Sequence, residues 1–210
     1  MGIFKDYLDS LGESNNLERM LESPVKISGD APFETLNGRN KSIKALKEDF
    51  IKIGSIDNLD VYKHNNLDYI IVGDVYMDNL IGDERFGIIA ELSYTIDKIK
   101  SSNKLINGKE AIKIPTIQVK ETHRRDKIAS RLYLLLLDRY VVISDGVQYK
   151  GAVALWKSFV EIPGIKLYIY DIIEDKIISK MTAITHDNSI WSNGDLGDYS
   201  KNKVRLILSL

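Results

Sequence analysis

Residues 112–156 constrain the fold of this chain more than any other part of the sequence. Residues 127–138 are apolar on most of the circumference of a helix, which is typical of a buried helix. Residues 140–143 then form a continuous apolar run, typical of a strand covered on both faces. With a strand before the helix, this order predicts a βαβ unit with a right-handed crossover.

The strand that precedes the helix changes phase along its length. Ile112 and Ile114 alternate with polar neighbours, and Ile117 and Val119 do the same one residue out of step. Such a slip predicts a β-bulge, and Pro115 stands at the slip, where a missing N–H is tolerated. Two separate short strands are the alternative.

A basic turn joins this strand to the helix. Arg124, Arg125 and Lys127 crowd the start of the helix, and Asp126 offsets only part of their charge. A helix N-terminus already carries partial positive charge and unpaired N–H groups, so the arrangement suits an arriving anion such as a phosphate. The alternative is a solvated basic turn.

These residues resemble a known family, the GNAT acyltransferases. Its motif A is similar to the order of seven residues here: Val119, Arg124, Arg125, Ile128, Ala129, Leu132 and Tyr133. Its motif B resembles a second set: Ala152, Leu155, Trp156 and Phe159. The resemblance implies that acetyl-CoA is the co-substrate and that a backbone N–H near Thr116 or Ile117 binds the thioester oxygen. The residues it assigns to the coenzyme are Ile117, Val119, Arg124, Arg125, Asp126, Lys127, Ile128 and Ala129.

The sequence also departs from the family pattern. Lys127 stands where motif A has its central glycine, and Glu121 replaces the usual proline. Trp156 occupies the position of the tyrosine that often protonates the leaving thiolate, and Tyr149 that of an asparagine. An indole N–H is no useful acid, but a thiol has a reference pKa of about 8.5, so coenzyme A can leave as a thiolate.

Three residues are candidates for acid–base chemistry. Asp145 follows the apolar strand and could deprotonate an amine, although the Ser-Asp-Gly context also predicts a turn residue. Glu91 lies in an apolar strand, either facing solvent by alternation, the favoured interpretation, or serving as a site carboxylate. Tyr149 could replace the missing acid, or it packs in the core.

Composition narrows the remaining function classes. The chain has 210 residues, no cysteine and a formal net charge of −1. Near-neutral charge argues against nucleic-acid binding, and the scattered histidines predict no metal site. No apolar run reaches membrane-span length, and the first residues lack a signal-peptide core, so a cytoplasmic location is expected.

The predicted fold class is α/β: a GNAT-like mixed, mostly antiparallel twisted sheet with a central βαβ unit that binds acyl-CoA. Residues 1–24 are predicted to form a helical arm, and residues 25–210 the domain, which ends in an extra C-terminal strand. The expected function is N-acetyl transfer from acetyl-CoA to an amine acceptor.

A second expectation is a catalytically degenerate structural or binding protein. The opening residues 4–8 resemble the starts of some proteins of large tailed phages. Under this alternative the chain is a component of a phage virion, and residues 1–24 dock it into a protein assembly.

Overall fold

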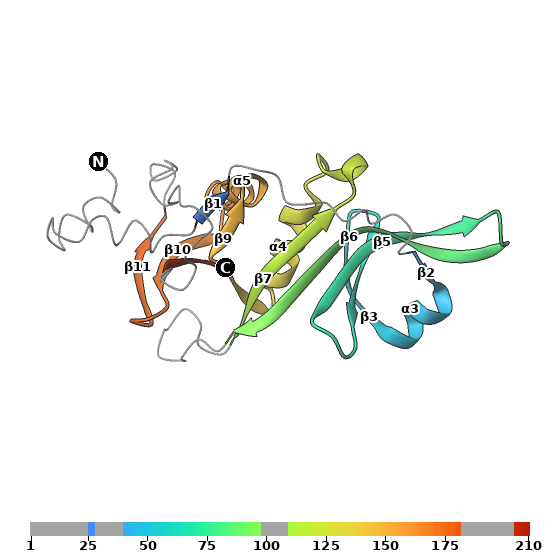
Figure 1. Cartoon of the computed structure of the whole chain (residues 1–210), viewed down its shortest axis with the longest axis horizontal. Coiled ribbons are helices and arrows are strands. Elements are labelled where there is room, and N and C mark those ends of the chain that lie inside the picture. Colours follow the sequence, from blue (N-terminus) through green and yellow to red (C-terminus); the bar gives the residue numbers. More distant parts are fainter. Residues whose placement is uncertain (1–24, 28–39, 98–108, 182–203) are drawn as a thin grey trace, which may run out of the picture. The chain divides into compact units, whose positions relative to one another are not determined.

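The computed structural model of the chain describes residues 25–27, 40–97, 109–181 and 204–210 (Figure 1). The predicted helical arm, residues 1–24, lies outside the described residues. The chain divides into two compact units. The first unit comprises Met1–Pro32, Ile96–Lys113 and Leu137–Leu210, and the second comprises Phe33–Thr95 and Ile114–Leu136.

The second unit is built on antiparallel strands. In hydrogen-bonded order these are β6 (Asp83–Asp97), β5 (Tyr69–Asp78), β4 (Leu59–His64) and β3 (Phe50–Ile56), and the short β2 (Lys41–Ser42) pairs with β6. The pairing of β4 with β5 reaches only Gly73, so β5 and β6 continue beyond it as a ribbon to their hairpin (Figure 1).

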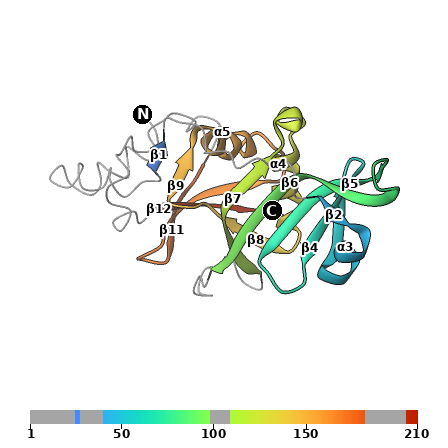
Figure 2. The ribbon, with the colours of Figure 1, turned by 45° about the vertical axis from the view of Figure 1, so that its right-hand side comes forward.

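One helix of this unit is shorter than its sequence predicts. The pattern predicts a helix from Asn40 or Ser42 through Ile51, whereas α3 spans Ile43–Asp49 (Figure 2). Ser42 caps this helix, because its side chain accepts a hydrogen bond from the Ala45 N–H at 3.2 Å. Phe50 and Ile51 belong to β3, where they pair with His64 and Lys63. Long-range strand pairing therefore overrides the helical periodicity at this end.

Helices cover both faces of the second unit's strands. Leu46 of α3 packs with Phe50, Ile71, Phe86 and Ile88 in a buried cluster. At Gly54 of β3, a Leu135 methyl group of α4 (Ile128–Leu137) lies 3.0 Å from the position that a Cβ would take. Gly54 therefore allows α4 to approach the strand closely.

The first unit holds the second part of the sheet. Its strands are β8 (Tyr140–Ile143), β9 (Val147–Tyr149), β10 (Lys166–Asp171), β11 (Lys176–Lys180) and β12 (Val204–Ser209), with α5 at Lys150–Phe159. β12 lies between β10 and β8 and is antiparallel to both, so the C-terminal strand is internal to the sheet. β9 pairs in parallel with β1 (Val25–Ile27) in a separate two-stranded sheet.

The predicted fold class is wrong. The described residues are mostly strand and form a ten-stranded mixed sheet in the order β11-β10-β12-β8-β7-β6-β5-β4-β3, with β2 on β6, rather than a GNAT-like α/β fold with a central βαβ unit. β7 spans Glu110–Val119. The family pattern that predicts the fold rests on residues 112–159 alone, whereas strand pairing between distant segments decides the sheet, as at Phe50–Ile56, whose first two residues are predicted to be helical.

The close contact between β5 and β6 gives the first testable prediction. A Cβ added at Gly73 would lie 2.0 Å from the Gly87 carbonyl oxygen, a backbone atom of the neighbouring strand. Because the strands must separate, we expect Gly73→Ala to lower the free energy of unfolding by about 3 kcal/mol in a urea titration. Gly151→Ala in α5, where nothing lies within 4 Å, is the control and should raise stability by about 0.5 kcal/mol. Equal midpoints for the two variants would contradict the prediction.

Candidate functional site

The C-terminal half of β7 is where the candidate site begins. β7 pairs in parallel with β8 only from Glu110 to Lys113, opposite Tyr140–Ile143. Residues 114–119 continue the strand in the second unit, with β6 as their neighbour on one side. Within the described parts of the chain no strand is recorded against their other edge. That edge therefore presents backbone N–H and C=O groups without a recorded sheet partner.

The predicted change of phase in this strand is visible in its burial. Ile112 and Ile114 are buried, Pro115 and Thr116 are both exposed, and Ile117 is half-buried. The strand is continuous, so the alternative of two short strands is wrong. The bulge itself stays a prediction.

A tight turn follows the strand. The Lys120 N–H donates to the Ile89 carbonyl of β6 at 2.8 Å, and the 3-10 helix η2 (Glu121–His123) begins immediately afterwards. The Asp126 N–H donates to the His123 carbonyl at 3.2 Å. The first of these hydrogen bonds joins the turn to β6, and the second closes the turn on itself.

The turn ends at the N-terminus of α4. The Arg131 N–H donates to the Lys127 carbonyl at 3.1 Å, which is the first bond of the helix. The N–H groups of Ile128, Ala129 and Ser130 consequently have no acceptor within the helix. An anion at this position would meet both these groups and the positive end of the helix dipole.

Cationic side chains surround this helix terminus. Arg124, Arg125 and Lys127 are exposed, and Asp126 is the only carboxylate between Arg124 and Ala129. Arg131, one turn further along the helix, forms an ion pair with Asp57 in the turn between β3 and β4. That pair anchors the start of α4 to the strands of the second unit.

Lys127 has the backbone conformation of a glycine. Its φ angle is +56°, in the left-handed region that a residue with a Cβ adopts at a cost. A glycine would adopt this conformation without that cost, so the backbone here favours a residue that the sequence does not supply.

Gln118 is a polar residue that sequence reasoning missed. Its Oε1 is buried and has no hydrogen-bond partner among the described residues. Buried hydrogen-bond acceptors are nearly always paired, so an unpaired acceptor at the end of β7 is an unusual feature of this strand. No sequence signal identifies it, because burial at this position depends on the neighbouring strand.

Glu91 is buried, so the favoured interpretation of a solvent-facing residue is wrong. It is only 6% exposed, and its Oε2 accepts a hydrogen bond from the Tyr69 hydroxyl at 2.5 Å. Alternation failed as a guide because both faces of β6 are covered, and Ile88, Ile89, Ala90 and Leu92 around it are buried too. Glu91 lies two residues beyond Ile89, the acceptor of the Lys120 N–H, and so close to the end of β7.

Asp145 belongs to the first unit and behaves as a turn residue. Its Oδ1 accepts a hydrogen bond from the Gly146 N–H at 2.8 Å. The guanidinium of Arg205 lies 2.9 Å from where a Gly146 Cβ would be. Burial lowers the pKa of Arg205, and the negative charges of Asp145 and Asp97 oppose that shift. Asp145 thus has a structural role in balancing a half-buried cation.

The other motif positions also lie in the first unit. Tyr149 ends β9, opposite Ile27 of β1, and its side chain lies outside the described residues. Trp156 is buried in α5 and contacts Phe159 edge to face at 6.0 Å between ring centroids. The turn and Glu91 therefore belong to one unit, whereas Asp145, Tyr149 and Trp156 belong to the other.

In the described ranges no group of three or more histidine, cysteine, aspartate or glutamate residues is arranged to hold a metal ion. None of the helices described is both long and apolar enough to cross a membrane.

No family model, curated protein or solved structure matches this chain.

The conformation of Lys127 gives the second testable prediction. Lys127→Gly removes the Cβ from a residue in the left-handed conformation, which relieves about 1–2 kcal/mol of backbone strain in the folded state. Glycine also makes the unfolded chain more flexible, and this partly offsets the gain in stability. We expect the free energy of unfolding to rise by about 0.5 kcal/mol in urea. Lys127→Ala keeps the Cβ and removes the same charge, so it should bring no gain. A gain of equal size in both variants would show that charge, and not backbone strain, decides stability here.

Proposed function

We propose that the chain binds an acyl-CoA at the turn formed by residues 120–127 and transfers the acyl group to an amine. One observation carries the proposal: the strand edge at residues 114–119 has no recorded partner in the described chain and leads directly into an exposed cationic turn and a helix N-terminus.

The chemistry of an acyl-CoA fits these three features in order. Its pantetheine arm is extended and carries amides, which can pair with a free strand edge as an added strand does. Its diphosphate suits N–H groups at a helix terminus together with arginine side chains. The strand edge, the cationic turn and the start of the helix follow one another within one unit. An acyl-CoA bound there would place its thioester and pantetheine arm along the strand edge and its diphosphate at the turn and the helix start.

Lys127 also suits an acyl-CoA, although it is not a glycine. The left-handed backbone at this position orients the turn as a glycine would, and the ammonium group adds a cation beside Arg124 and Arg125. The side chain is exposed, which leaves it free to move toward a phosphate.

Glu91 is the proposed proton acceptor. The acceptor nitrogen attacks the thioester carbonyl, the carbon–sulfur bond breaks, and coenzyme A leaves as the thiolate. The proton lost by the nitrogen passes to the Glu91 carboxylate and then to solvent. Tyr69 orients that carboxylate through its 2.5 Å hydrogen bond. We choose Glu91 over Asp145 because it shares a unit with the turn and is not committed to a local turn.

Coenzyme binding is the third testable prediction. Acetyl-CoA titrated calorimetrically into the full chain should bind one to one, and a large excess should raise the melting temperature by about 5 °C. Arg124→Ala should weaken binding by about 10-fold or more, because it removes a charge-assisted bond to the diphosphate. Arg139→Ala, an exposed arginine after α4, is the matched control and should leave binding unchanged. The absence of heat and of a thermal shift at millimolar coenzyme would refute the proposal.

The role of Glu91 is the fourth testable prediction. Glu91→Gln preserves volume and can still accept from Tyr69, but it cannot take up a proton. With a panel of amines as acceptors, we expect kcat to fall by about 100-fold while KM for acetyl-CoA stays unchanged. Glu84→Gln, an exposed position on the same strand, should leave both constants unchanged. A parallel loss of coenzyme binding in Glu91→Gln would indicate a structural role instead.

A further inference from the structure

The hairpin between β5 and β6 exposes an unusual apolar surface. Leu80 at its tip is 97% exposed and Ile81 is 55% exposed. Met77 and Val75 are also exposed and alternate along β5, which places both on one face of the ribbon. Four large apolar side chains within residues 75–81 are more than scattered surface residues and indicate a contact surface.

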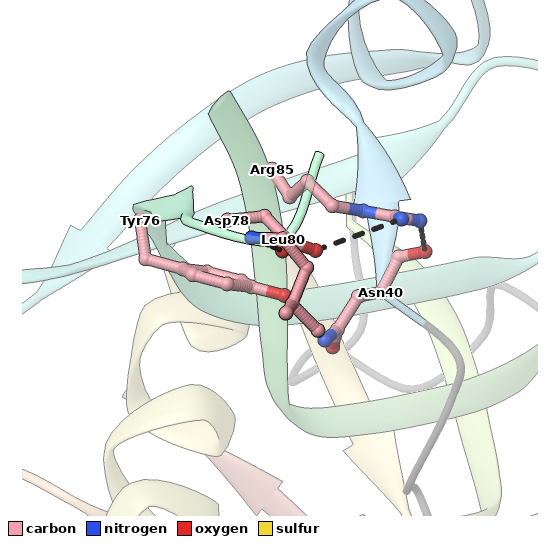
Figure 3. A network of polar contacts seen from close by, with 5 residues as sticks. All are labelled: Asn40, Tyr76, Asp78, Leu80 and Arg85. Atoms are coloured by element: carbon pink, nitrogen blue, oxygen red, sulfur yellow. Dashed lines mark hydrogen bonds and ion pairs between the residues drawn. The ribbon is translucent and has the colours of Figure 1, made fainter. Parts of the chain in front are cut away.

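The hairpin is held in shape by polar contacts with Asn40, which precedes β2 (Figure 3). The Asn40 Nδ2 donates to the Tyr76 hydroxyl at 2.8 Å, and Arg85 Nη2 donates to the Asn40 carbonyl at 3.1 Å. At the tip, Asp78 Oδ1 accepts from the Leu80 N–H at 3.1 Å, and its carboxylate lies 4.0 Å from Arg85.

Two backbone bonds complete the tip. The N–H groups of Ile81 and Gly82 both donate to the Asp78 carbonyl, at 3.2 and 2.8 Å. Gly82 has a φ of +73°, which closes the turn. The apolar side chains therefore project from a hydrogen-bonded turn, so little backbone conformational entropy is lost when they bind.

Charge decides what this surface can meet. The hairpin is acidic, because residues 74–85 contain four carboxylates (Asp74, Asp78, Asp83 and Glu84) and one cation, Arg85. Two hairpins facing each other would bring carboxylates together, and anionic lipid headgroups would be repelled in the same way. The complementary surface is cationic with apolar residues beside it.

The same chain carries such a surface. The basic turn contains four cations (Lys120, Arg124, Arg125 and Lys127) and two carboxylates (Glu121 and Asp126). The half-buried Ile117 and Val119 come directly before it. We propose that the hairpin of one copy docks on the basic turn of a second copy, in a head-to-tail contact. A contact of this kind joins different surfaces of the two copies, so it can extend to chains longer than a dimer.

The test is sedimentation of the full chain without coenzyme, so that it does not depend on the proposed acyl transfer. At about 0.5 mM protein and about 20 mM salt we expect the weight-average mass to exceed the monomer mass by about 1.5-fold or more, and the excess to be lost at about 0.5 M salt. Leu80→Asp should yield monomer under all conditions. Leu67→Asp, at another exposed leucine of the same unit, should associate like the unaltered chain.

A charge exchange identifies the docking surface. Asp83→Lys with Glu84→Lys makes the hairpin cationic, and Arg125→Glu with Lys127→Glu makes the turn anionic. Each double variant alone should be monomeric, and an equimolar mixture should associate again. A monomeric unaltered chain at every concentration would overturn the proposal, and so would association that survives in the Arg125→Glu, Lys127→Glu variant.

Discussion

The hydrogen-bonding requirement of the backbone along β7 determines most of what surrounds the candidate site. A strand satisfies its N–H and C=O groups through the strands on its two sides. β7 has β6 on one side, but its recorded pairing with β8 on the other side ends at Lys113. The boundary between the two units falls at the same residue. The remaining edge, the basic turn and the start of α4 then follow one another without interruption.

Polar groups inside the second unit carry a second constraint. A carboxylate buried as deeply as Glu91 is costly unless it is paired, and the Tyr69 hydroxyl supplies one of its hydrogen bonds. Gln118 Oε1, buried at the end of β7, has no partner in the described residues. The paired Glu91 carboxylate and the unpaired Gln118 Oε1 are buried polar groups, and the cationic turn follows Gln118 in the chain. These groups distinguish this part of the second unit from an ordinary apolar core.

Local patterns predicted some elements well. The apolar circumference of residues 127–138 corresponds to α4, and the Ser42 cap corresponds to the start of α3. Residues 204–209 form the predicted last strand. These features depend on neighbours three or four residues apart, or on alternation within one strand, so the local sequence contains the information.

Other features depended on contacts between distant residues. The sequence by itself determined the buried helix and the cationic turn before it, because side-chain type and spacing decide these. Only the tertiary structure decided that Phe50–Ile56 is a strand, that Glu91 is buried beside Tyr69, and that β12 enters the sheet between β8 and β10. The physical reason is that strand pairing and burial are properties of two or more segments at once, and one segment read alone does not specify its partner.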